Sequence, residues 1–163
     1  MGQTTDITYD HALQQRFTSI KAMTQQTPGQ DSVKRGTILV IDDNPDIRRL
    51  LRLTLEKNYV VLEAADGRSA LQMLARHRPP LVLLDIMMPG ELDGLQVLDA
   101  IKNDPQLQCT LVAMVTARAQ TMDSIDARMR GADAYFIKPF TPRDIRAWVD
   151  ARMPTTQPSQ VKG

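Results

Sequence analysis

Five short apolar runs divide the central part of this chain, and each is followed directly by a polar residue. The runs are too short for buried helices and are rich in branched and aromatic side chains, which is typical of buried β-strands. Strands that alternate with amphipathic segments predict a parallel sheet with helices on both faces. The expected strands are Ile38–Ile41, Tyr59–Leu62, Leu81–Leu84, Leu111–Val115 and Tyr135–Ile137.

The segments between the strands predict amphipathic helices. Asn44–Pro45 and Thr141–Pro142 each place a capping residue before a first-turn proline. Right-handed crossovers then favour an α/β fold, a flavodoxin-like (βα)5 doubly wound parallel five-stranded sheet in a single domain. The apolar positions expected along the helix faces are Ile47, Leu50, Leu51, Leu55, Leu71, Leu74, Leu95, Leu98, Ile101, Ile125, Met129, Ile145, Trp148 and Val149.

Composition changes at both ends of this patterned region. Residues 1–36 are rich in Gln and Thr and predict an N-terminal extension that is disordered or partly helical. Residues 37–153 form the expected domain, and residues 154–163 predict a disordered C-terminal tail. Because little chain remains after Met153 for a DNA-binding or enzymatic module, we expect a stand-alone domain.

Charge and composition exclude several classes of protein. The formal net charge of +1 and the aromatic content of 4% argue against direct binding to nucleic acid. The single Cys109 cannot form an internal disulfide, and no apolar run approaches the length needed to cross a bilayer. We therefore expect a cytoplasmic protein with no membrane association.

Side chains suited to phosphate chemistry follow four of the five strands: Asp42 and Asp43, Asp85, Thr116, and Lys138. Ligands of doubly wound sheets bind beyond the carboxyl ends of the strands, so these side chains should converge. Converging carboxylates repel one another unless a cation lies among them, and Mg²⁺ is a hard ion that prefers oxygen ligands. The lysine and the hydroxyl complete a set that suits a phosphoryl group.

Four stretches of the chain together form a specific pattern: Leu39–Asp43, Leu84–Gly90, Val115–Ala117 and Lys138–Phe140. In order and spacing they resemble the receiver domain of response regulators from two-component systems, in its stand-alone, chemotaxis-regulator-like form. The resemblance covers about residues 37–153.

This resemblance implies a role for each matching residue. Asp85 becomes the phosphoacceptor, and Mg²⁺ is held by Asp42, Asp43, Asp85 and the backbone carbonyl of Met87. Lys138 contacts the phosphoryl group, and the Lys138–Pro139 bond is cis. Thr116 and Tyr135 become the switch pair, although Tyr135 also fits an ordinary half-buried sheet residue.

Two departures from the family pattern stand out. Glu91–Leu92 makes the loop after Pro89–Gly90 one residue longer than is common, so this loop is expected to follow a different path. Met87 and Arg118 occupy positions that, in the family, tune the lifetime of the acyl phosphate.

The implied function is a Mg²⁺-dependent phosphoacceptor that switches protein–protein interactions, rather than a turnover enzyme. Its expected partners are a sensor histidine kinase or histidine phosphotransfer protein, a downstream protein, and a second copy bound through the last two strand–helix units. One alternative is a Mg²⁺-dependent phosphohydrolase with Asp85 as nucleophile, although Met87 stands where such enzymes carry a general acid. Another is a receiver-shaped adaptor that is not phosphorylated.

Overall fold

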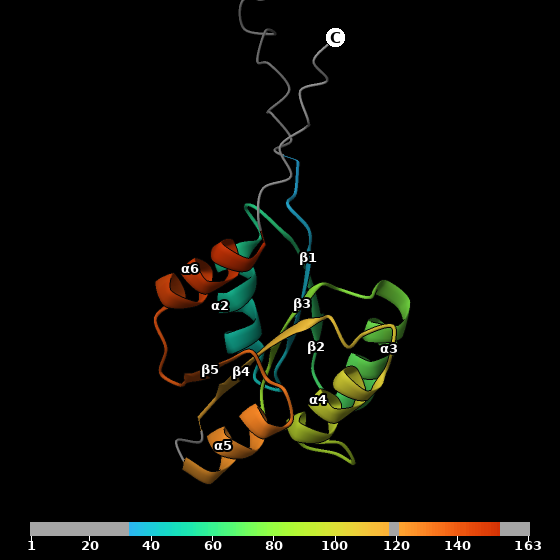
Figure 1. The fold of residues 1–163 in the computed structure, drawn as a ribbon. Coiled ribbons are helices and arrows are strands. Elements are labelled where there is room, and N and C mark those ends of the chain that lie inside the picture. Colours follow the sequence, from blue (N-terminus) through green and yellow to red (C-terminus); the bar gives the residue numbers. More distant parts are fainter. Residues whose placement is uncertain (1–32, 118–120, 154–163) are drawn as a thin grey trace, which may run out of the picture. The chain divides into compact units, whose positions relative to one another are not determined.

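The computed structural model describes residues 33–117 and 121–153, in which strands and helices alternate as the sequence predicts (Figure 1). None of the helices in these ranges is long and apolar enough to cross a membrane. The predictions for residues 1–32 and 154–163, and for Arg118, lie outside the described residues. The elements are β1 (Thr37–Ile41), α2 (Pro45–Leu55), β2 (Val60–Ala64), α3 (Gly67–His77), β3 (Leu81–Leu84), α4 (Gly94–Asn103), β4 (Leu111–Thr116), α5 (Thr121–Met129), β5 (Ala134–Ile137) and α6 (Pro142–Arg152).

The five strands form one parallel sheet in the order β2-β1-β3-β4-β5. From β1 the chain moves outward to β2, and then returns past β1 to β3 and onward to β5. The direction of progress therefore reverses between β1 and β3, which makes their carboxyl ends the expected ligand-binding edge. This order confirms the flavodoxin-like, doubly wound fold.

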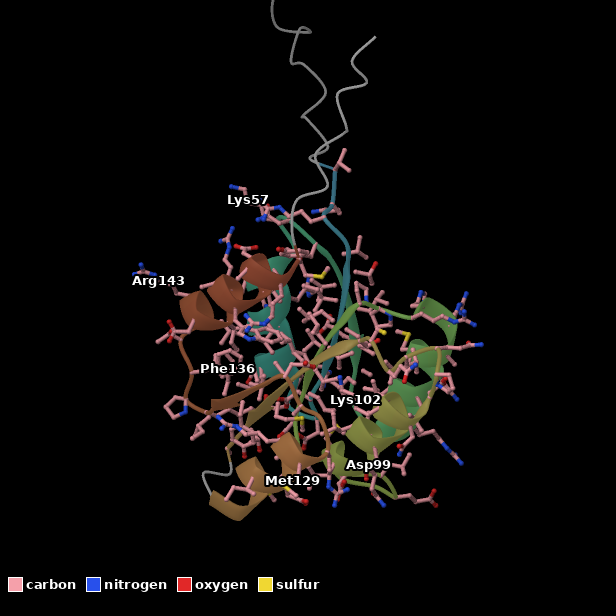
Figure 2. All side chains as sticks on the ribbon, viewed as in Figure 1. Lys57, Asp99, Lys102, Met129, Phe136 and Arg143 are labelled. Atoms are coloured by element: carbon pink, nitrogen blue, oxygen red, sulfur yellow. The ribbon has the colours of Figure 1, made fainter. Side chains whose placement is uncertain are left out.

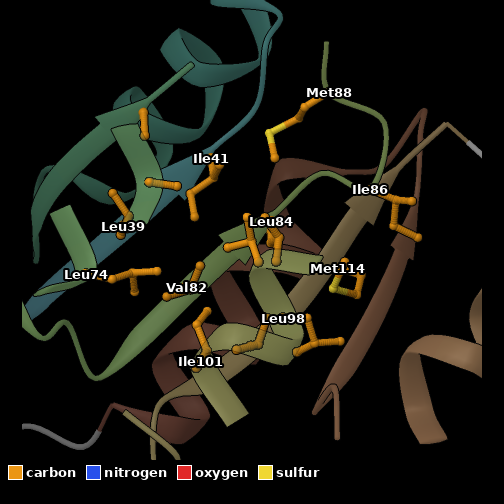
Figure 3. Packing of buried hydrophobic residues seen from close by; sticks show 14 of the residues in the cluster. Leu39, Ile41, Leu74, Val82, Leu84, Ile86, Met88, Leu98, Ile101 and Met114 are labelled. Atoms are coloured by element: carbon orange, nitrogen blue, oxygen red, sulfur yellow. The ribbon is translucent and has the colours of Figure 1, made fainter. Parts of the chain in front are cut away.

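Helices cover both faces of the sheet, with α2 and α6 on one face and α3 and α4 on the other (Figure 1). Side chains alternate between the two apolar layers along each strand, because successive residues of a strand point to opposite faces. In β1, Leu39 and Ile41 join the layer beneath α3 and α4 (Figure 3), whereas Ile38 and Val40 join the layer beneath α2 and α6. Burial on both faces explains why the strands read as continuous apolar runs.

Polar caps start the helices close to the strand ends. The Asn44 side chain accepts hydrogen bonds from the backbone N–H groups of the first turn of α2, and Thr141 caps α6. Both caps were predicted. Asp66 and Asp93 cap α3 and α4, the latter through a reciprocal capping box with Gln96. These caps keep the connections short and polar at the carboxyl edge of the sheet.

The apolar pair expected along one face of α5 does not face the core. Ile125 is 49% exposed and Met129, labelled in Figure 2, is 83% exposed. The described core contact of this helix comes from the fully buried Ala127. Leu50 on α2 is likewise 39% exposed, while Leu51 and Leu55 are buried. Helical spacing identifies residues that share a face, but the rotation of the helix on the sheet decides which face is covered.

Candidate functional site

Three carboxylates meet at the carboxyl edge of the sheet. Asp42 and Asp43 follow β1 and Asp85 follows β3, and one oxygen from each lies within 4.8 Å of the others. The two strands are neighbours, with Ile41 paired to Leu84, so both strands reach this edge of the sheet at the same level. Register explains why residues more than forty positions apart in sequence converge.

Lys138 brings a positive charge to the same edge. It follows β5, and its Nζ lies 2.6 Å from Oδ2 of Asp42 and 3.3 Å from Oδ2 of Asp85. The three side chains are only 16%, 2% and 5% exposed, in the order Lys138, Asp42, Asp85. The Lys138–Pro139 bond is cis, as the resemblance implied. The ammonium therefore bridges two buried carboxylates.

Backbone N–H groups orient the other oxygens of the buried pair. The N–H of Asn44 donates to Oδ1 of Asp42 at 2.9 Å, and the N–H of Met87 donates to Oδ1 of Asp85 at 3.1 Å. Each buried carboxylate thus accepts from the backbone with one oxygen and from Lys138 with the other. Asp43 differs because its side chain is exposed.

Burial and charge shift two pKa values in the site. Burial raises the pKa of Asp85, the charge of Lys138 opposes this rise, and the nearby Asp42 reinforces it. For Lys138, burial alone would lower the pKa, but the hydrogen bond to Asp42 and the charge of Asp85 outweigh it and raise the pKa. Lys138 is therefore charged at neutral pH, and an ionised Asp85 is incompletely compensated.

The residues present fit a divalent cation such as Mg²⁺. Three carboxylates face a single ammonium group, so the fully ionised cluster carries excess negative charge. The atoms that these side chains offer as metal ligands are all carboxylate oxygens, which hard cations prefer. The exposed Asp43 leaves one side of the cluster open to solvent.

Two glycines allow the loops around this edge to approach closely. A Cβ on Gly94 would lie 1.9 Å from the carbonyl oxygen of Asp85, and one on Gly67 would lie 2.6 Å from Cβ of Leu92. Leu92 belongs to the lengthened loop, which therefore packs against the start of α3. A cavity of about 610 Å³ opens there, lined by Asp43, Ala65, Asp66, Gly67, Arg68, Pro89, Gly90, Glu91 and Leu92.

Thr116 and Tyr135 lie on neighbouring strands beside the cluster. Thr116 is fully buried at the end of β4, and its carbonyl accepts a hydrogen bond from the backbone N–H of Lys138 at 2.8 Å. Tyr135 is partly buried, pairs with Met114 in register, and packs against the apolar layer beneath α3 and α4. By strand alternation Thr116 projects to the same face as Met114 and Tyr135.

Arg48, Gly67 and Gly94 were not singled out from the sequence. The guanidinium of Arg48 donates to the backbone carbonyls of Asp42 and Asp43. Arg48 lies in the first turn of the helix that follows the acidic pair. This position is the sequence signal that could have identified its contact with the loop. Nothing in the local sequence around Gly67 indicates its contact with Leu92, because that contact joins two distant loops.

Comparisons with known proteins point to one family. A family model described as the response regulator receiver domain matches residues 38–150. The transcriptional regulatory protein SrrA of Staphylococcus aureus is 35% identical over 126 residues, which cover 77% of this chain and 51% of SrrA. This chain thus spans about half the length of that relative.

Solved structures share the fold. The chemotaxis protein CheY4 of Vibrio cholerae is 28% identical with a TM-score of 0.67, and the match covers 73% of this chain and 98% of CheY4. The BeF3-activated receiver domain of DrrB is 26% identical with a TM-score of 0.66, and the match covers 71% of this chain and 95% of that one.

Proposed function

The chain belongs to the response regulator receiver domain family of two-component signal transduction, and on this premise we propose that Asp85 is its phosphoacceptor. The observation that carries the proposal is the cluster of Asp42, Asp43 and Asp85 around the ammonium of Lys138. Asp85 is the member that follows the central strand β3 and accepts from the backbone N–H of Met87. The phosphodonor is a sensor histidine kinase or a histidine phosphotransfer protein.

In the transfer step, a carboxylate oxygen of Asp85 attacks the phosphorus of phosphohistidine. The P–N bond breaks, its electron pair stays on the imidazole nitrogen, and an acyl phosphate forms on Asp85. Lys138 then pairs with a phosphoryl oxygen while it keeps its contact with Asp42. Asp42, Asp43, Asp85 and the carbonyl of Met87 would hold Mg²⁺, which would supply positive charge beside the phosphoryl oxygens.

The added phosphoryl charge is the proposed switch. It introduces strong acceptor oxygens beside Thr116, whose hydroxyl moves to donate to them. That movement vacates space next to β4, into which Tyr135 turns, and the surface around β4, α5 and β5 changes. A partner shifts this equilibrium only by its differential affinity for the two arrangements, so activation is graded.

The output of the switch is protein binding in the cytoplasm rather than substrate turnover, DNA contact or membrane association. Three exposed apolar side chains support a docking surface on α5 and β5: Ile125, Met129 and Ile137, which are 49%, 83% and 48% exposed. A downstream protein, or a second copy of the chain in a homodimer, would cover this surface through the last two strand–helix units.

Acetyl phosphate with MgCl2 tests the assignment directly. Phosphorylation is read by intact mass, and beryllofluoride with MgCl2 supplies a stable state for amide NMR shifts. Asp85→Asn should abolish both responses, Thr116→Ala should permit phosphorylation but reduce the shifts on β5, and Lys138→Ala should impair transmission most. Phosphorylation of Asp85→Asn at the wild-type rate would overturn the proposed function.

A further inference from the structure

Arg48 joins the acidic loop to helix α2. It is the fourth residue of the helix, and its Nη1 donates hydrogen bonds to the backbone carbonyls of Asp42 at 2.8 Å and of Asp43 at 3.2 Å. Its side chain is 20% exposed, so most of it is packed against protein. One guanidinium thus holds both carbonyls of the acidic pair.

Glu63 on β2 faces the same guanidinium. Its Oε1 lies 3.7 Å from Nε of Arg48, and its Oε2 lies 3.3 Å from Nε of Arg52, one helical turn further along α2. Glu63 pairs in register with Val40 of β1, so this contact joins α2 to the strand that lies beside β1. Arg48 is therefore oriented from one side by Glu63 and bound to the loop on the other.

We propose that Arg48 is a positioning residue for the metal site, and this role rests on the metal site proposed above. Asp43 is exposed, so little packing fixes its carboxylate and the position of that group follows the backbone of the loop. Arg48 holds this backbone so that the Asp43 carboxylate stays near those of Asp42 and Asp85. Groups that orient metal ligands typically contribute about 10- to 100-fold to metal affinity.

The sign of the effect distinguishes positioning from simple electrostatics. A guanidinium beside the site repels a divalent cation, so loss of its charge alone would tighten Mg²⁺ binding. Loss of its hydrogen bonds to the loop would weaken Mg²⁺ binding. Arg48→Met removes both the charge and the hydrogen bonds. The proposal requires the loss of the hydrogen bonds to dominate, so that Mg²⁺ binding becomes weaker.

The test is a MgCl2 titration of the full chain followed by amide NMR shifts. Arg48→Met should weaken Mg²⁺ binding by about tenfold or more. The matched control is Arg49→Met, which makes the same charge change at the next, exposed position of α2 and should leave the affinity at or slightly above the wild-type value. Without metal, the Asn44 amide, which is bonded to Asp42 Oδ1, should exchange with solvent faster in Arg48→Met but not in Arg49→Met.

Arg48→Lys is the second variant, and it decides the matter if Arg48→Met does not fold. It keeps the charge but loses the planar guanidinium, whose Nε faces Glu63 while its Nη1 holds both carbonyls, so any loss of affinity reports positioning alone. Unchanged affinity in Arg48→Lys, or tighter binding in Arg48→Met, would overturn the role of Arg48 while leaving the metal site intact. Failure of the wild type to bind Mg²⁺ would instead overturn the proposed metal site, and this role with it.

Discussion

Replacing Lys138 with Met should destabilise the metal-free protein at neutral pH, because two buried carboxylates would lose the cation between them. The ammonium lies 2.6 Å from Asp42 and 3.3 Å from Asp85, whose side chains are 2% and 5% exposed. Removal of one partner from such a buried arrangement costs about 3–5 kcal/mol. The free energy of unfolding of a domain of this size is only about 5–15 kcal/mol, so this loss is a large share of it.

The loss should shrink as the pH falls. Burial already raises the pKa of Asp85 above its ordinary value of 3.8, and Lys138 is the main influence that opposes the rise. Without Lys138 the pKa should rise further. A carboxyl group with a raised pKa in the folded state destabilises the fold where it is ionised, and this penalty disappears as the pH falls through the folded pKa towards the unfolded value.

The assay is urea unfolding followed by the fluorescence of Trp148, which packs edge-to-face on Phe136 at 6.1 Å. Measurements at neutral pH and at about pH 4.5 separate the cost of the ionised carboxylates from other effects on stability. Measurements with and without MgCl2 show how much of that cost a bound cation offsets. Mg²⁺ at 100 times its dissociation constant should raise the free energy of unfolding of Lys138→Met by up to about 2.7 kcal/mol.

Lys57→Met is the matched control for this series. Lys57 is exposed and lies before β2, at the opposite end of the sheet (Figure 2), so its loss should change stability by no more than about 0.5 kcal/mol. A deficit in Lys138→Met below about 1 kcal/mol, or one that is equal at both pH values, would refute the compensating role of Lys138.

Four further measurements test other parts of the structure. Asp85→Asn should raise the free energy of unfolding at neutral pH and flatten the gain in stability that the wild type shows on acidification, measured by urea unfolding across pH. Asp43→Asn should weaken Mg²⁺ binding in an NMR titration but leave the metal-free stability unchanged, because this side chain is exposed. Gly94→Ala should cost at least about 1–3 kcal/mol in thermal unfolding, since its Cβ would lie 1.9 Å from the carbonyl oxygen of Asp85. Tyr59→Phe should cost about 1 kcal/mol through loss of the 2.6 Å hydrogen bond to Asp150. Burial, reinforced by Asp150, raises the pKa of Tyr59, so the wild type should also lose stability as the pH rises through that pKa, and the Phe variant should not.

The convergence of Asp42, Asp85 and Lys138 was predictable from the sequence, because it follows from general properties of parallel sheets. Each residue directly follows an apolar run, and the carboxyl ends of parallel strands share one edge. The doubly wound parallel sheet was also predictable, since right-handed crossovers leave few ways to arrange strands that alternate with helices. Strand boundaries shifted by one or two residues: β2 is Val60–Ala64 rather than Tyr59–Leu62, and β5 begins at Ala134.

Tertiary structure alone decided how these residues differ from one another. Asp42 and Asp43 are adjacent and chemically identical, yet Asp42 is 1% exposed and bonded to Lys138 while Asp43 is exposed. The burial of Ala127 in place of Met129 on α5 was settled in the same way. In each case the local pattern specifies which residues lie on a common face or edge. Burial and bonding depend on the partners that distant segments bring, and a local pattern does not contain them.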